Sequence, residues 1–248
     1  GTLHALVTNH VVSGRVIFPG AGYLEVARAA GGVALRGVYF LQPLATEALG
    51  LVVECALSDG RFEVRSHASE ASEDAILHCS GAMAQDAVWR RVDLASQRIR
   101  PCAADVVALY DGFDGVGLQY GPGYRTLINV WGGTNDALAR LCARSTHEGT
   151  QAHPADLDDA LCSSAAIGSG GGDETRLPFA VDGALLQGAP GELWAVRSLS
   201  HRHARANAPW LTTVSVRCCC AFAGCGARRA RGDSGGAGCC IGAIASAA

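Results

Sequence analysis

The stretch HVVSGRVIFPGAGYLEVARAAGG, residues 10–32, contains the clearest helix signal in the chain. Apolar residues recur at helical spacing between Gly20 and Ala30, and the pair Gly31-Gly32 indicates where the helix stops. Segments rich in β-branched and aromatic residues follow at 33–40, 50–56 and 62–66. Such segments are typical of strands. One helix followed by antiparallel strands predicts an α+β unit.

The second half of the chain repeats this content after residues 93–104, where the apolar pattern lapses and an internal linker is predicted. A helix is predicted at 105–110, and another begins after Pro154. Strands are predicted at 126–131, 137–143, 178–185, 191–197 and 212–218. Beyond Cys218 two alternatives stay open: a structureless tail, which the glycine content favours, or one last strand near 239–244. We therefore predict two units, 1–95 and 96–248.

The composition excludes several kinds of chemistry. All 20 basic residues are arginine, so no lysine can form a Schiff base or bind a phosphate in a Walker loop. A net charge of -3 argues against nucleic-acid binding, and no apolar segment approaches the roughly 20 residues that cross a membrane. The 11 cysteines include no Cys-x-x-Cys pair, which argues against a metal site. Because the start lacks a signal-peptide pattern and an initiator methionine, we expect a cytoplasmic piece of a longer protein.

The first candidate for chemistry is His10, upstream of the predicted helix start. Free backbone N–H groups at Gly20, which has no side chain, can approach a carbonyl oxygen closely. His10 could then remove a proton from the neighbouring carbon. The alternative is an ordinary histidine at a strand end, beside a Pro-Gly turn.

The second candidate is the segment HPADLDDALCSS, residues 153–164. On a helix, Asp158 and Cys162 share one face beside an apolar stripe. Burial of that face would raise the pKa of Asp158 and suit it to act as a general acid. The alternative is a solvated Asp158 in an acidic first turn, where Asp156 and Asp159 are its neighbours.

The third candidate is the segment YGPGY, residues 120–124. Its Pro and Gly residues indicate a tight turn that could hold the Tyr120 phenol beside a site. The alternative is a turn that only packs two tyrosines.

Taken together, these segments resemble the dehydratase domain of modular polyketide synthases. Three motifs of that family occur in its order: His-x-x-x-Gly-x-x-x-x-Pro, Tyr-Gly-Pro, and an aspartate motif that begins His-Pro-Ala. The matching residues are His10, Gly14, Pro19, Tyr120, Gly121, Pro122 and Asp158. The segments LHCSGAM (77–83) and LPFAVDG (177–183) are weaker matches.

The resemblance implies a double hotdog, in which two fused units each wrap an antiparallel sheet around a helix. It implies that water is eliminated from a 3-hydroxyacyl thioester on an acyl carrier protein, to give a 2-enoyl thioester without a cofactor. The implied partners are this carrier protein, other polyketide synthase domains and a second copy of the chain.

The resemblance also implies roles for individual residues. His10 would be the base and Asp158 the acid. The residues expected to bind substrate are Tyr120, Gly20, Cys162 and Gly121. Those expected to shape the motifs are Gly14, Pro19 and Pro122. Because the two catalytic residues come from different units, we expect the site where the units meet.

The chain departs from the family pattern at two site positions. Cys162 stands where the family usually has Gln or His, and a thiol is a weak hydrogen-bonding group. Asp156 stands where the family tends to have leucine. A catalytically silent domain that serves dimerisation or carrier-protein docking is therefore an alternative, and double-bond migration is a third.

Overall fold

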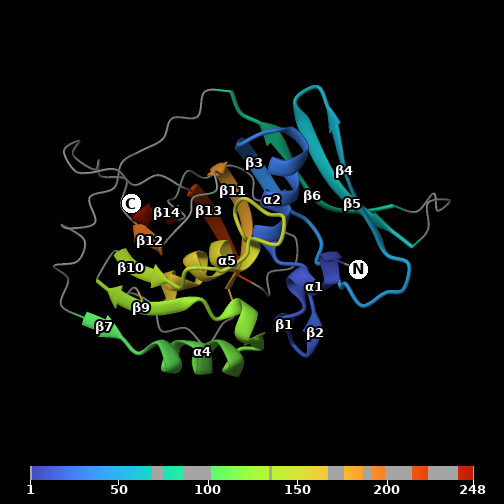
Figure 1. Cartoon of the computed structure of the whole chain (residues 1–248). Helices are drawn as coiled ribbons and strands as arrows, with labels where there is room; N and C mark the ends of the chain where they lie inside the picture. The colour runs from blue at the N-terminus through green and yellow to red at the C-terminus, as the bar shows by residue number, and fades with distance from the viewer. Residues whose placement is uncertain are drawn as a thin grey trace.

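The computed structural model describes residues 2–68, 75–85, 102–133, 136–166, 176–186, 192–198, 214–222 and 240–247 (Figure 1). The helices are α1 (Thr2–Val7), α2 (Gly20–Gly31), α4 (Val106–Gly115) and α5 (Pro154–Cys162). The strands of the first half are β1 (His10–Val12), β2 (Arg15–Val16), β3 (Ala34–Phe40), β4 (Val52–Ser58), β5 (Arg61–His67) and β6 (Ile76–Met83). Those of the second half are β7 (Cys102–Ala104), β8 (Leu118–Tyr120), β9 (Leu127–Gly132), β10 (Asp136–Leu141), β11 (Arg176–Leu186), β12 (Glu192–Ser198), β13 (Val214–Phe222) and β14 (Cys240–Ala247).

Local sequence explains where the two central helices begin and end. Pro19 has an extended backbone before α2, and Gly32 ends that helix at φ 140°, a conformation that favours glycine. Pro154 occupies the first turn of α5, where its missing N–H costs nothing. The His153 side chain accepts a hydrogen bond from the Ala155 N–H and so caps this helix. Both predicted helices are confirmed.

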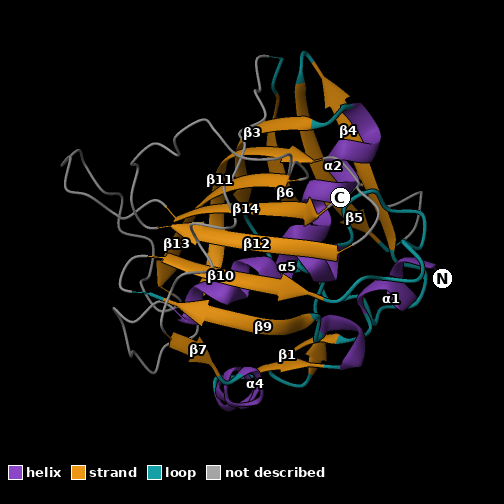
Figure 2. Cartoon of the chain, turned by 60° about the vertical axis from the view of Figure 1, so that its left-hand side comes forward, coloured by secondary structure: helices purple, strands orange, loops and turns teal. Residues whose placement is uncertain are grey.

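Eleven strands form one antiparallel sheet in the order β4-β5-β6-β3-β11-β13-β14-β12-β10-β9-β7. The first four come from the first half of the chain and the others from the second half. The pairing of β3 with β11, which sets Val38 opposite Val181, joins the halves into a continuous sheet. Figure 2 shows α5 against strands of the second half, and α2 contacts strands β3, β4 and β5 of the first half. The arrangement is the predicted α+β double hotdog.

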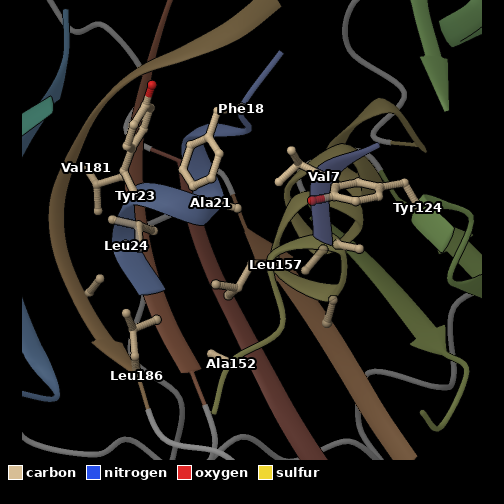
Figure 3. Close-up of a cluster of buried hydrophobic side chains, with 14 of the residues drawn as sticks. Val7, Phe18, Ala21, Tyr23, Leu24, Tyr124, Ala152, Leu157, Val181 and Leu186 are labelled. Atoms are coloured by element: carbon tan, nitrogen blue, oxygen red, sulfur yellow. The ribbon is translucent and has the colours of Figure 1, made fainter. Parts of the chain in front are cut away.

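The hydrophobic core is continuous across both halves. Ala21 and Leu24 on α2 and Leu157 on α5 are buried in one cluster, with Leu157 projecting from α5 toward α2 (Figure 3). Val181 of β11 and Tyr124 belong to the same cluster. Burial of these side chains between the helices and the sheet fixes the relative position of α2 and α5.

The structure corrects one prediction about the chain's organisation and decides between two alternatives for another segment. The segment 93–104 is not a linker throughout, because Cys102–Ala104 forms β7 beside β9. Of the two alternatives for the segment after Cys218, the last strand near 239–244 is confirmed: β13 continues to Phe222, and β14 pairs with both β12 and β13. Hydrogen bonding along both edges of β14 outweighs its glycine- and alanine-rich composition. Residues 86–101 and 223–239 lie outside the described residues, so the boundary at residue 95 stays a prediction.

Candidate active site

His10 lies on β1, opposite Tyr120 of β8 in an antiparallel pair. Its Nδ1 is 2.7 Å from the carbonyl oxygen of Ile17. A carbonyl can only accept a hydrogen bond, so Nδ1 carries the hydrogen. In the neutral ring, Nε2 then has a free lone pair. The Ile17 carbonyl, directly after β2, therefore fixes both the tautomer and the direction of the imidazole.

Asp158 lies on α5 and faces this nitrogen. Its Oδ2 is 3.7 Å from His10 Nε2, and the residue is 8% exposed. Among the described residues Oδ2 has no hydrogen-bond partner. Burial raises the pKa of Asp158, and the His10 charge and the Tyr120 hydroxyl offset only part of this. The solvated alternative is wrong: Asp158 is a buried carboxyl group, and its burial raises its pKa.

Tyr120 and Cys162 lie beside this pair. The Tyr120 hydroxyl is 3.4 Å from Cys162 Sγ. Burial and the neighbouring Asp158 raise the pKa of Tyr120, so its hydroxyl keeps its proton. The rings of Tyr120 and Tyr124 lie 5.5 and 5.3 Å from the His10 ring, between centroids. The two tyrosines are packed, as the structural alternative expected, and they also form a wall of the site.

The motif glycines and prolines have distinct positions. Gly14 has φ 78° in the turn between β1 and β2, which favours glycine. Gly20 is the first residue of α2, and no side chain caps that helix start. Its N–H therefore has no partner within the helix. Pro19 is the residue before α2, and Pro122 begins a short 3₁₀ turn.

Gly121 differs from its predicted role. Its N–H donates to the Asn9 carbonyl oxygen at 2.8 Å, and a Cβ at this position would collide with the Asn9 side chain. This N–H is already engaged, so it cannot also bind substrate. Gly121 instead lets the tyrosine turn pack closely against the residue that precedes His10.

The other two aspartates of α5, Asp156 and Asp159, are also buried, so the alternative of a solvated acidic turn is wrong for them as well. Asp156 Oδ1 accepts from Arg144 Nε at 2.7 Å, while Arg144 Nη2 donates to the Gly123 carbonyl at 3.2 Å. The unusual charge at 156 thus has a buried partner, although burial still raises the pKa of Asp156. Asp159 Oδ2 accepts from Thr126 and from the Tyr110 hydroxyl. Burial raises its pKa to about 7.

Sequence reasoning missed several residues that hold the site together. His153 is buried, and desolvation together with the nearby Arg144 charge lowers its pKa to about 3, which keeps the ring neutral. Glu25, on the otherwise apolar buried side of α2, contacts the segment before α5. A glutamate on such a helix, with arginine three residues later, was the available signal.

Within the described ranges, no group of three or more His, Cys, Asp or Glu side chains has the arrangement of a metal site. No helix in the same ranges is long and apolar enough to cross a membrane.

Comparison with known proteins gives consistent matches. A family model described as "Polyketide synthase dehydratase domain" matches residues 1–74. A second, described as "Polyketide synthase dehydratase N-terminal domain", matches residues 95–217. Polyketide synthase ThaG of Burkholderia thailandensis is 33% identical over 211 residues, which are 77% of this chain and 4% of ThaG. The chain thus corresponds to a small part of such relatives.

Solved structures share the fold. The dehydratase domain from the CurF module of the curacin polyketide synthase superposes with a TM-score of 0.70 at 21% identity, covering 98% of this chain and 88% of that one. An inactive mutant of CurK dehydratase, with asparagine in place of an aspartate, has a TM-score of 0.67 at 23% identity and covers 98% and 90%. Another inactive CurK mutant, with phenylalanine in place of a histidine, has a TM-score of 0.67 at 22% identity and covers 98% and 85%. With its ordered motifs, its double hotdog fold and two matching family models, the chain belongs to the polyketide synthase dehydratase domain family.

Proposed function

We propose that the domain eliminates water from a 3-hydroxyacyl thioester carried by an acyl carrier protein and releases a 2-enoyl thioester. The observation that carries this proposal is the juxtaposition of His10 Nε2 and Asp158 Oδ2 at 3.7 Å. One group is a base with a fixed lone pair, and the other is a buried acid whose Oδ2 has no hydrogen-bond partner among the described residues.

The elimination divides between these two side chains. His10 Nε2 takes the proton from C2 of the substrate, and the electrons of that bond form the C2–C3 double bond. Asp158 donates its proton to the hydroxyl on C3, which leaves as water. His10 is then protonated and Asp158 ionised, so the opposite charges face each other until the proton returns. Each such acid or base contributes on the order of 10²- to 10⁴-fold in rate.

Two further groups support the charge that develops. The thioester oxygen gains negative charge as C2 loses its proton, and the Gly20 N–H at the uncapped start of α2 is the proposed donor. One such donor contributes about 10²- to 10³-fold. The Tyr120 hydroxyl, held beside Cys162, is proposed to hold the departing hydroxyl group or orient Asp158. Imidazole, carboxyl and N–H groups supply every part of this elimination, so the proposal includes no cofactor.

The relatives support the residue types and the partners. The two CurK dehydratases that are inactive mutants have lost an aspartate or a histidine, which are the residue types of Asp158 and His10. The relatives are large polyketide synthases. We therefore propose that this domain works in the cytoplasm beside other synthase domains, receives substrate from an acyl carrier protein and forms a homodimer.

The direct test supplies the substrate in both configurations. The domain is incubated with (3R)- and (3S)-3-hydroxyacyl carrier protein of several chain lengths, and the acyl groups are analysed by mass spectrometry. The loss of one water from one configuration is expected. If the carrier protein binds but no acyl group loses water, the domain is catalytically silent, which the weak Tyr120–Cys162 contact would then explain.

A further inference from the structure

A buried carboxylate outside the catalytic pair connects the two central helices. Glu25 on α2 has a side chain that is 7% exposed. Arg28 donates to it through Nε at 2.7 Å and through Nη2 at 2.9 Å. The backbone N–H groups of Gln151 and Ala152 donate to it at 2.7 and 3.3 Å. Each carboxylate oxygen thus accepts two hydrogen bonds, one from the arginine and one from the backbone.

The backbone donors are at a sensitive place. Gln151 and Ala152 directly precede His153, which caps α5, and Pro154, which begins it. They are 126 and 127 residues from Glu25 in sequence. The contact therefore ties α2, whose first residue is Gly20, to the start of the helix that carries Asp158.

Loss of this carboxylate would free the start of α5. Arg28 has a side chain that is 12% exposed, so it would become a nearly buried charge without a partner. The Gln151 and Ala152 N–H groups would also lose their acceptor. Catalytic geometry is sensitive to such freedom, since a displacement of about 1 Å can cost roughly 10²-fold in rate.

We propose that Glu25 is a positioning residue, which holds the start of α5 so that Asp158 stays opposite His10 in productive geometry. This inference rests on the proposed dehydratase function. Because Arg28 and the two backbone donors use its oxygens, Glu25 acts through α5 and not on the substrate.

The test compares four variants with the unmodified domain. Glu25→Gln removes the charge, and Arg28→Met keeps the carboxylate for the two N–H groups. The swap Glu25→Arg with Arg28→Glu keeps opposite charges on α2 but puts no acceptor at position 25. Glu63→Gln is the control, because the Glu63 side chain is 41% exposed where it pairs with Arg65 on β5. For each variant, kcat, KM, thermal unfolding and hydrogen exchange at Gln151 and Ala152 are measured.

Glu25→Gln and the swap are expected to lower kcat about 10- to 100-fold with KM changed less than about threefold, and to speed amide exchange at Gln151 and Ala152. Arg28→Met should have a smaller effect, and Glu63→Gln none. Recovery of wild-type kcat in the swap would overturn the proposal, since it would show that only the ion pair matters. A folded Glu25→Gln with wild-type kcat and exchange would also overturn it.

Two further outcomes are decisive. If Glu25→Gln does not fold, Glu25→Asp replaces it. Three results then support the positioning role of Glu25: wild-type kcat in the folded Glu25→Asp, slow exchange at both amides in Arg28→Met, and fast exchange at both amides in the swap. Equal exchange rates in Arg28→Met and in the swap would overturn it. If the unmodified domain forms no enoyl product, the proposed function fails on that result. Unchanged exchange at Gln151 and Ala152 in Glu25→Gln would separately refute the positioning role of Glu25.

Discussion

The buried pair of Asp156 and Arg144 gives a quantitative test of how this chain tolerates a charge inside α5. The side chains are 4% and 14% exposed. Removing one partner of a buried pair costs about 3–5 kcal/mol, because the other charge stays buried. Asp156→Leu alone is therefore expected to lose about 3–5 kcal/mol of unfolding free energy. At roughly 2–4 °C per kcal/mol for a chain of this size, Tm should fall by about 10 °C.

The double variant Asp156→Leu with Arg144→Met is expected to recover most of this loss. It removes both charges and puts apolar side chains in their place, which is often neutral or stabilising. Only the hydrogen bond from Arg144 to the Gly123 carbonyl has no replacement, at about 1 kcal/mol. Guanidinium unfolding at pH 7, followed by circular dichroism, should give an interaction free energy of about 2 kcal/mol or more.

Two results would refute this reasoning. Asp156→Leu could be as stable as the unmodified domain, which would mean that Arg144 reaches solvent when its partner is absent. The double variant could lose the sum of the two single losses, which would mean that the charges act independently. Glu63→Gln, at the exposed pair on β5, is the matched control and should change the unfolding free energy by less than about 1 kcal/mol.

Three other outcomes follow from the site. Gly121→Ala should destabilise the domain by about 1–3 kcal/mol, because its Cβ would meet the Asn9 side chain; adding Asn9→Ala should relieve this in thermal unfolding. The folded-state pKa of His153 is lowered to about 3 from 6.5, so the unfolded chain binds more protons between these values and acid destabilises the domain. His153→Asn keeps a capping side chain, and its unfolding free energy should fall less between pH 7 and 4; an unchanged slope would contradict the assignment. Tyr120→Phe keeps the ring and should lower kcat about tenfold in the enoyl-formation assay. Wild-type kcat would exclude a role of the Tyr120 hydroxyl in the elimination.

Sequence reasoning reached the parts of this molecule that local pattern determines. The helices around Tyr23 and Leu157 follow from apolar spacing, and His10, Tyr120 and Asp158 follow from motif order. The structure brings all three of these side chains together.

Other features depend on partners that are distant in sequence. A solvated acidic turn stayed open as an alternative for Asp156 and Asp159 because their partners, Arg144 and Thr126, lie 12 and 33 residues earlier. The role of Glu25 was missed for the same reason, because its backbone donors lie 126 and 127 residues away. Strand β14 was the less favoured of two alternatives, because its neighbours in the sheet, and not its own composition, make it a strand. Local patterns find the proposed reacting groups, but not the buried polar contacts that hold them in place.

The measurement that tests the central claim most directly is the rate of enoyl formation from one 3-hydroxyacyl carrier protein by four proteins: the unmodified domain, His10→Ala, Asp158→Asn and the double variant. If the two residues act as base and acid of one step, each single variant should lose at least about 10²-fold. The double variant should then lose much less than the product of the two single losses. Full turnover by either single variant, with the fold intact by circular dichroism, would contradict the account.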